Sequence, residues 1–261
     1  MSKIRVKNFG PIKNGFSKSD DWIEIKRVTV FIGNQGSGKS TIAKLISTCS
    51  WIEKALTRGD FNKKWFIQND RFRKTYCAYH RLQDYFLNDH GDDTAHIEYI
   101  GESYSIEYKE GQLKIEEISN GNYELPQIMY VPAERNFIST IRSPKLLKLS
   151  SDPLVEFLTE FDNAKQELKN SILLPINNTK VDYDKLNDTI NIKGEDFRVS
   201  LTEASSGFQS LVPLFLVSRH LALLIASQSN NDSKPMSSDE LDRFKKGVSD
   251  IWSNSDLTDE Q

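Results

Sequence analysis

The sequence predicts an α/β protein, and three observations carry that prediction. Residues 4–9 and 22–32 alternate polar and apolar side chains or run apolar with many β-branched residues, a pattern typical of strands. The second segment ends at a glycine-rich loop, after which apolar residues recur at helical spacing. Residues 96–118 then alternate around two turn glycines, as an antiparallel meander does.

The composition is that of an ordinary folded protein. The chain has 261 residues, 38 % hydrophobic and 27 % charged, enough for one large α/β domain or a head with an inserted lobe. The net charge of −3 argues against a generally basic surface for nucleic acid. Cys49 and Cys77 lie far apart and lack Cys or His partners at zinc-ligand spacing, so neither a disulfide framework nor structural zinc is indicated.

The N-terminus lacks the apolar core of a signal peptide. The longest apolar run, Leu211–Ala226, is interrupted by Pro213, Arg219 and His220, whereas a spanning helix needs about 20 mostly apolar residues. We therefore expect a cytoplasmic protein without a membrane span, in which this run is a buried helix.

The loop at Gly33–Ser40 reads Gly-Asn-Gln-Gly-Ser-Gly-Lys-Ser and matches the P-loop pattern G-x-x-x-x-G-K-[ST] at every fixed position. Glycines let backbone N–H groups surround a β-phosphate, and the N-terminus of the following helix adds a positive dipole. We expect Lys39 to bridge the β- and γ-phosphates and Ser40 Oγ to ligate Mg²⁺. The sequence thus predicts a site for ATP and Mg²⁺ made of Gly33, Asn34, Gln35, Gly36, Ser37, Gly38, Lys39, Ser40 and Thr41.

The next segment is basic and rich in aromatic residues. Residues 1–50 hold the N-terminal strands, the P-loop and its helix, and residues 51–95 continue as an inserted helical arm. Between Lys54 and Arg81 stand eight basic and two acidic residues, a net charge of about +6. The arm is a candidate for nucleic-acid binding through Arg71, Arg73 and Lys74. The alternative is a helical subdomain whose aromatics form a core and whose lysines face water.

The remaining elements are assigned from periodicity and turn residues. Residues 96–135 hold the meander and a short apolar strand at Gln127–Val131, and 136–185 form a helical lobe with Leu154, Phe157, Leu158 and Phe161 on one face. Residues 186–226 hold a hairpin, a Ser/Gly turn and the apolar helix, and 227–261 hold a polar linker and an amphipathic helix that starts near Ser237. The four histidines show no ligand spacing.

The Ser/Gly turn, Glu203–Ser210, resembles the signature motif of ABC and SMC ATPases. The opening of the chain is similar to SMC and RecF proteins, and Tyr130–Asn136 lies where that superfamily keeps its Q-loop. This resemblance implies a P-loop NTPase of the ABC/SMC-head type, with a mixed sheet, an antiparallel meander and an inserted helical lobe. It also implies that the turn contacts the γ-phosphate held by a second subunit, through Ser205, Ser206, Gly207 and Gln209. A plain helix N-cap is the alternative for these serines.

The closest resemblance within that superfamily is to the PtuA-type ATPases of Septu and retron-associated anti-phage systems. Three stretches carry it: residues 32–47, Val131–Asn136 and Ser205–Pro213. The resemblance implies an ATPase dimer or higher oligomer with ATP between its heads. It further implies an HNH nuclease partner, PtuB, and in retrons a reverse transcriptase with its DNA product.

The chain departs from this family in two places. An active ATPase of this class needs a Walker B strand with an aspartate near Mg²⁺ and a glutamate that polarises water, and none follows the signature turn. We therefore expect a head that is truncated or completed by another polypeptide, with ATP binding and weak or no hydrolysis. Ala133 or Glu134 stands where the Q-loop glutamine is expected. Glu134 is either a catalytic carboxylate near metal or water, or a structural partner of Arg135.

Three classes of function remain open at this point. The first is an ATPase that drives assembly of a defence complex or acts in DNA repair or maintenance. The second is a scaffold or sensor that ATP stabilises without turnover, and the missing Walker B strand favours it. The third, a P-loop kinase or GTPase, is disfavoured because no N-K-x-D motif or arginine-rich lid follows the P-loop.

Overall fold

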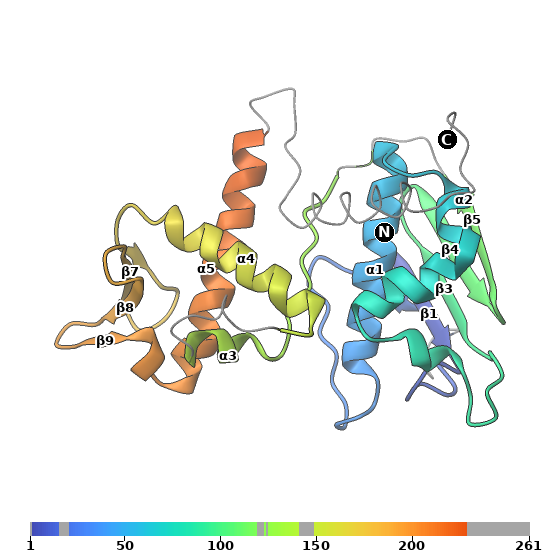
Figure 1. The fold of residues 1–261 in the computed structure, drawn as a ribbon, viewed down its shortest axis with the longest axis horizontal. Coiled ribbons are helices and arrows are strands. Elements are labelled where there is room, and N and C mark those ends of the chain that lie inside the picture. Colours follow the sequence, from blue (N-terminus) through green and yellow to red (C-terminus); the bar gives the residue numbers. More distant parts are fainter. Residues whose placement is uncertain (1, 16–20, 119–122, 124, 141–148, 229–261) are drawn as a thin grey trace. The chain divides into compact units, whose positions relative to one another are not determined.

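The structure is a computed structural model that describes residues 2–15, 21–118, 123, 125–140 and 149–228. It consists of two compact units, Met1–Tyr130 and Val131–Gln261, each described by itself (Figure 1). Each unit combines helices with one antiparallel sheet, so the prediction of an α/β protein is confirmed. The amphipathic helix expected near Ser237 lies outside the described residues.

The first unit is built on a five-stranded sheet in the order β2-β1-β3-β4-β5. The expected meander is confirmed, with β3, β4 and β5 paired in sequence and Gly101 and Gly111 in the two turns. Gly111 has a φ of +84°, a conformation that other residues rarely adopt. The strands are β1 (Lys3–Lys7), β2 (Ile23–Glu24), β3 (His96–Ile100), β4 (Tyr104–Lys109) and β5 (Gln112–Glu117).

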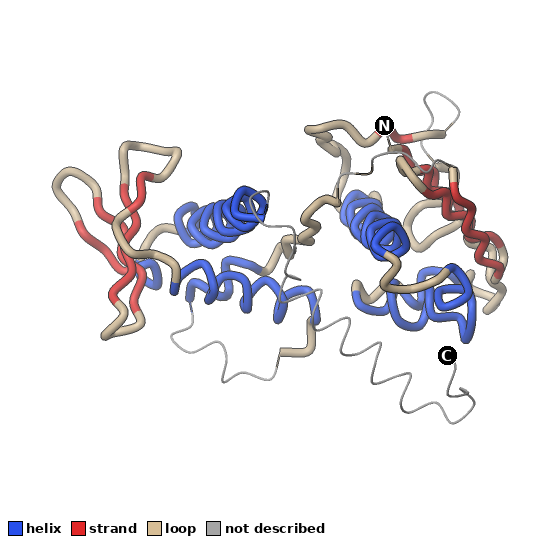
Figure 2. The backbone as a smooth tube through the Cα atoms, turned by 90° about the horizontal axis from the view of Figure 1, so that it is seen from above, coloured by secondary structure: helices blue, strands red, loops and turns tan. Residues whose placement is uncertain are grey.

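Helices cover one face of this sheet (Figure 2). The longest, α1 (Lys39–Arg58), begins at the P-loop and runs past residue 50, so the segment 51–95 starts inside it. After it come α2 (Lys63–Ile67), 3-10 turns at Gln68–Asp70 and Gln83–Phe86, and a π-helical turn at Phe72–Cys77. Their aromatic side chains are buried in one core with the sheet, which includes Phe66, Phe72, Phe86, Tyr99 and Tyr108.

Two predicted strands are not formed among the described residues. The strand expected over 22–32 is confirmed only at Ile23–Glu24, and Val28, Val30 and Ile32 are 78 %, 73 % and 93 % exposed. The strand expected at Gln127–Val131 is also unpaired. An apolar strand needs neighbours on its edges and faces, and the described chain offers none here. All described strand pairs are antiparallel, so the expected mixed sheet is not observed in that part of the chain.

A buried carboxylate joins α1 to the turn between β3 and β4. Glu53 is 1 % exposed, and its Oε1 accepts the backbone N–H groups of Glu102, Ser103 and Tyr104 at 2.7, 2.7 and 3.2 Å. Its Oε2 accepts the Tyr99 hydroxyl at 2.8 Å. Burial, followed by the nearby Glu53 charge, raises the pKa of Tyr99, so this hydroxyl stays a donor. Backbone N–H groups compensate the desolvation of this carboxylate, which has no cationic partner among the described residues.

We predict that Glu53→Ala lowers the free energy of unfolding of the first unit by about 2–4 kcal/mol, because it leaves buried donors unmatched. Thr57→Ala, one turn further along α1 and exposed, is the control and should change it by less than about 0.5 kcal/mol. Urea titration followed by tryptophan fluorescence measures both values.

Gly101→Ala provides a second arm of the same test. A Cβ at this position would lie 2.2 Å from both carboxylate oxygens of Glu53. Gly101→Ala should therefore lower the free energy of unfolding less when Glu53→Ala is already present. If the two substitutions lower it additively in the double variant, the glycine is needed for another reason.

The described residues of the second unit form three helices, a 3-10 turn and a four-stranded sheet in the order β6-β7-β8-β9. The expected apolar face of α4 is confirmed, because Leu154, Phe157, Leu158 and Phe161 are buried. The segment 136–185 was expected to be helical, but it also contains β6 and β7. The elements are α3 (Arg135–Thr140), α4 (Asp152–Gln166), β6 (Ile172–Leu173), β7 (Lys180–Asp184), β8 (Thr189–Lys193), β9 (Arg198–Ser200), the 3-10 turn Leu201–Glu203 and α5 (Ser206–Gln228).

Pairing with β8 explains why residues 180–184 form the strand β7. Val181 and Tyr183 stand opposite Ile192 and Ile190 of β8, which places apolar residues of both strands on one face. The expected hairpin around residue 194 is confirmed as β8–β9. The alternation of residues 180–184 was therefore a strand signal that became decisive only together with its partner strand.

Helix α5 is buried along its middle part only. Val212, Leu216 and Val217 are in the core, whereas Leu223 and Ile225 are exposed, so the expected burial of Leu211–Ala226 is correct only for part of the run. Ser206–Ala226 is long and apolar enough to cross a membrane. The core helix of a soluble protein can have the same length and hydropathy, so these two properties do not distinguish a membrane span from a core helix.

Both cysteines are buried in the first unit and carry free thiols. Burial raises the pKa of each thiol, and the charge of Glu53 adds to this effect at Cys49. Because the thiolate is the reactive species, we predict that maleimide labels the native protein slower than the urea-unfolded chain by about two orders of magnitude or more. Rapid labelling of either cysteine under native conditions, read by mass spectrometry, would contradict this packing.

Candidate functional site

The P-loop leads into α1 through two glycines in left-handed conformations. Gly36 and Gly38 have φ values of +77° and +88°. A Cβ on Gly38 would lie 2.5 Å from Ile12 Cγ1, so both the conformation and the close approach require glycine. Gly38 is the N-cap of α1 and provides no side-chain cap, and the first turn holds no acidic residue. The dipole and N–H groups at this helix end are therefore suited to an anion.

The side chain of Lys39 folds back into the loop. Its Nζ donates to the carbonyl oxygens of Gly33 and Asn34 at 2.8 and 2.6 Å and lies 3.4 Å from Ser37 Oγ. The loop thus holds one positive charge beside the helix N-terminus. Ser40 and Gln35 are exposed, whereas Thr41 is buried and supports the first turn of α1.

The Ser/Gly turn exposes its small residues at the start of α5. Ser205, Ser206 and Gly207 are all exposed, and the Gln209 N–H donates to the Ser205 carbonyl at 3.0 Å. Gln209 Nε2 donates to the Thr202 carbonyl at 3.1 Å, so this side chain belongs to the turn itself. Hydroxyls and a helix N-terminus are again suited to an anion, here at the surface of the second unit.

A proline inside α5 explains why α3 packs against this turn. Pro213 has no N–H to donate to the carbonyl of Gln209, four residues earlier. Ser139 Oγ donates to that carbonyl instead, at 2.7 Å, and Arg135 Nε donates to the neighbouring Ser210 carbonyl at 3.3 Å. Sequence reasoning noted the proline but missed Ser139, because the free carbonyl does not reveal its distant partner.

Glu134 and Arg135 have different environments: the first is exposed, and the second donates hydrogen bonds to backbone carbonyls. Arg135 donates to the Ser210 and Pro132 carbonyls, which is a structural role at the start of α5. Glu134 is exposed, and its carbonyl accepts the Phe137 N–H at 2.9 Å in the first turn of α3. Glu134 belongs to the second unit and the P-loop to the first, so the structure does not unite them in one described site.

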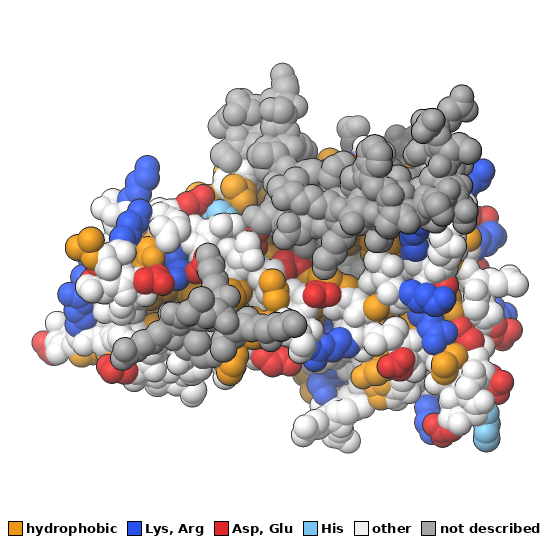
Figure 3. All heavy atoms as spheres, viewed as in Figure 1, with side chains coloured by type: hydrophobic (Ala, Val, Ile, Leu, Met, Phe, Trp, Pro, Cys, Tyr) orange, Lys and Arg blue, Asp and Glu red, His pale blue; other side chains and the backbone are white. Residues whose placement is uncertain are grey.

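All three nucleic-acid candidates make contacts within the unit, and Lys74 Nζ lies 4.0 Å from Asp70 Oδ2. Arg71 is buried, stacks 3.7 Å from the Trp65 ring centroid and donates to the Trp65 carbonyl. Arg73 donates to the Gln83 carbonyl at 2.9 Å, while Lys74 is exposed. Basic and acidic side chains are interspersed on the face drawn in Figure 3. These contacts agree with the alternative of an aromatic core with lysines facing water.

The histidines occupy four different environments. His80 is buried between the rings of Tyr79 and Tyr130, and His90 is exposed. His220 is buried with Nε2 3.3 Å from Glu160 Oε2 and Nδ1 2.8 Å from Glu167 Oε2, which ties α5 to α4. His96 lies among carboxylates on the sheet of the first unit.

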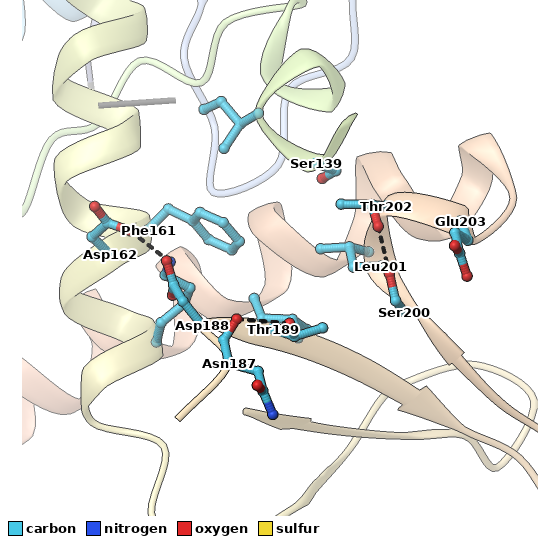
Figure 4. A pocket seen from close by; sticks show the side chains of 13 residues that line it. Ser139, Phe161, Asp162, Asn187, Asp188, Thr189, Ser200, Leu201, Thr202 and Glu203 are labelled. Carbon is cyan, nitrogen blue, oxygen red and sulfur yellow. Dashed lines mark hydrogen bonds and ion pairs between the residues drawn. The ribbon is translucent and has the colours of Figure 1, made fainter. Parts of the chain in front are cut away.

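The second unit also contains a cavity of about 480 Å³ that the sequence did not predict (Figure 4). Lys165 binds Asp162 and Asp188 at 2.9 and 3.0 Å in its wall. The 3-10 turn that leads into Ser205 forms another wall, with Ser200 and Thr202 hydroxyls 2.5 Å apart. The other lining residues are Ile138, Ser139, Phe161, Asn187, Thr189, Ile190, Leu201 and Glu203.

Comparison with known proteins returns no match. No protein-family model, no curated protein and no solved structure matches the chain. The functional conclusion therefore depends on the P-loop and on the Ser/Gly turn.

We predict that Ser139→Ala lowers the free energy of unfolding of the second unit by about 1–3 kcal/mol, since it leaves the Gln209 carbonyl without its donor. The loss should be much smaller in a Pro213→Ala background, where a backbone N–H at position 213 can bond that carbonyl. Thr140→Ala, an exposed neighbour on α3, is the control. If Ser139→Ala lowers the free energy of unfolding equally with Pro213 and with Pro213→Ala, as measured by urea unfolding, the proposed replacement bond is contradicted.

Proposed function

We propose that this chain is an ATP-binding subunit of ABC/SMC type, which holds Mg²⁺-ATP at Gly33–Thr41. The observation that carries the proposal is the uncapped N-terminus of α1 behind two left-handed glycines, with Lys39 held in the same loop. Phosphate oxygens can replace the carbonyl oxygens that now accept from Lys39. Ser40 would then ligate Mg²⁺ through its exposed hydroxyl.

We further propose that ATP joins two copies of the chain. Ser205, Ser206 and Gly207 are exposed at a helix N-terminus and could contact the γ-phosphate held by the partner copy. The resemblance to PtuA-type ATPases supports a cytoplasmic anti-phage complex with an HNH nuclease. In a retron setting, a reverse transcriptase and its DNA product would join it.

The second candidate is an ATP-stabilised scaffold without turnover. The absence of a Walker B pattern from the sequence supports it, and so does the exposed, unpaired stretch at Val28–Ile32 directly before the P-loop. In an active head the P-loop strand needs neighbouring strands to position the catalytic carboxylate. Glu134 could replace that carboxylate only if the two units bring it to the nucleotide.

We predict that Lys39→Ala weakens Mg²⁺-ATP binding roughly 10- to 100-fold, because it removes one charge-assisted contact worth about 1.5–3 kcal/mol. Lys64→Ala removes an exposed lysine from α2 and is the matched control. Calorimetric titration measures binding, while light scattering follows oligomerisation and phosphate release follows turnover. Unchanged ATP affinity in Lys39→Ala would reject the site.

The same titration separates the metal contact and the two candidate functions. Ser40→Ala should weaken binding only when Mg²⁺ is present. Binding and association without phosphate release would support the scaffold. Phosphate release that Glu134→Gln abolishes would support an ATPase that uses this carboxylate.

A further inference from the structure

We propose that the outer face of the first unit's sheet carries a divalent metal site formed by His96, Glu98 and Glu107. It is separate from the P-loop and does not depend on the function proposed above. His96 and Glu98 are two residues apart on β3 and share the face that points away from the core. Glu107 stands directly opposite Glu98 on β4.

The three ligand atoms converge. His96 Nε2 lies 2.9 Å from Glu98 Oε1 and 3.6 Å from Glu107 Oε1, and all three atoms lie within 4.8 Å of one another. Ligands about 2.0–2.2 Å from a tetrahedral Zn²⁺ are roughly 3.3–3.5 Å apart, so small side-chain movements suffice. The side chains are 25 %, 17 % and 45 % exposed, which leaves access for an ion.

The charges around the cluster leave room for a cation. Two glutamates directly opposite each other on adjacent strands repel. Nearby cations compensate part of this charge, because Arg5 binds Glu98, and Lys114 stands opposite Glu107 although it pairs with Glu116 at 2.8 Å. Lys7 pairs with Asp21 at 2.5 Å. A dication between the two carboxylates would add to this compensation.

The imidazole nitrogen points into this cluster. His96 Nε2 has almost no solvent-accessible surface, although the whole side chain is 25 % exposed, and it lies 2.9 Å from Glu98 Oε1. With a proton on Nε2 the ring donates to Glu98, and without one the lone pair of Nε2 is available to a metal ion. Titration with Zn²⁺ separates these two alternatives.

Arg5 binds the same oxygen of Glu98 that lies beside His96. Its Nη2 and Nε lie 2.5 and 2.8 Å from Glu98 Oε1, and its guanidinium stacks 4.8 Å from the Trp22 ring centroid. A carboxylate held in this way can use its second oxygen for a metal, as outer contacts orient ligands in known sites. One imidazole nitrogen with two carboxylates fits Zn²⁺, with an open position for water.

The test is titration of the chelator-treated full chain with Zn²⁺ at pH 7.5, without nucleotide, by calorimetry and thermal unfolding. We expect one Zn²⁺ to bind and to raise the melting temperature. His96→Gln and Glu107→Gln should each lose this binding by at least about 10-fold. The controls are His90→Gln, an exposed histidine in a loop, and Glu116→Gln, a carboxylate on β5, and both should bind as the unchanged chain does.

Other outcomes overturn the proposal. Absence of Zn²⁺ binding by the folded chain would do so, as would equal loss in the two control variants. Stability that falls in His96→Gln equally with and without Zn²⁺ would identify an imidazolium ion-pair cluster instead. Circular dichroism of each metal-free variant establishes that the sheet is intact before the comparison.

Discussion

The first unit depends on the carboxylate of Glu53 more than on any other polar group. Helix α1 begins at the P-loop, and Glu53 lies 14 residues further on, about 21 Å along the helix axis. There three backbone N–H groups and the Tyr99 hydroxyl surround it. Apolar packing lets a helix slide or rotate over a sheet at low cost, but a buried charge with directed donors does not. The position of the phosphate loop on the sheet is therefore fixed from the far end of its helix.

In the second unit the group that needs a partner is an acceptor, the Gln209 carbonyl, and its donor comes from another helix. Pro213 removes a donor from α5, and Ser139 supplies one from α3. Arg135 adds a contact one residue further along, so α3 is joined to the turn that exposes Ser205 and Ser206. In each unit, a polar group that is matched by donors from another element decides how a helix that carries a candidate phosphate contact is held.

The sequence predicted the elements whose partners are close in the chain. The meander, the helix after the P-loop, the apolar face of α4 and the hairpin at residue 194 all follow from local periodicity and turn glycines. Val28–Ile32 has the composition of a strand, but strand formation depends on neighbours that the described chain does not provide. The grouping of 136–185 as a helical lobe did not include the strand at 180–184, because pairing with β8 decides that segment. Of the candidate site, the P-loop was readable from spacing, whereas the burial of Arg71 against Trp65 and the bond from Ser139 arise from tertiary contacts.

The exposed apolar stretch before the P-loop has a consequence for how the protein exists in a cell. An exposed segment with apolar side chains and no strand partner among the described residues is a template onto which an identical chain can add. Copies of the chain at high concentration would then be prone to aggregation and to proteolysis.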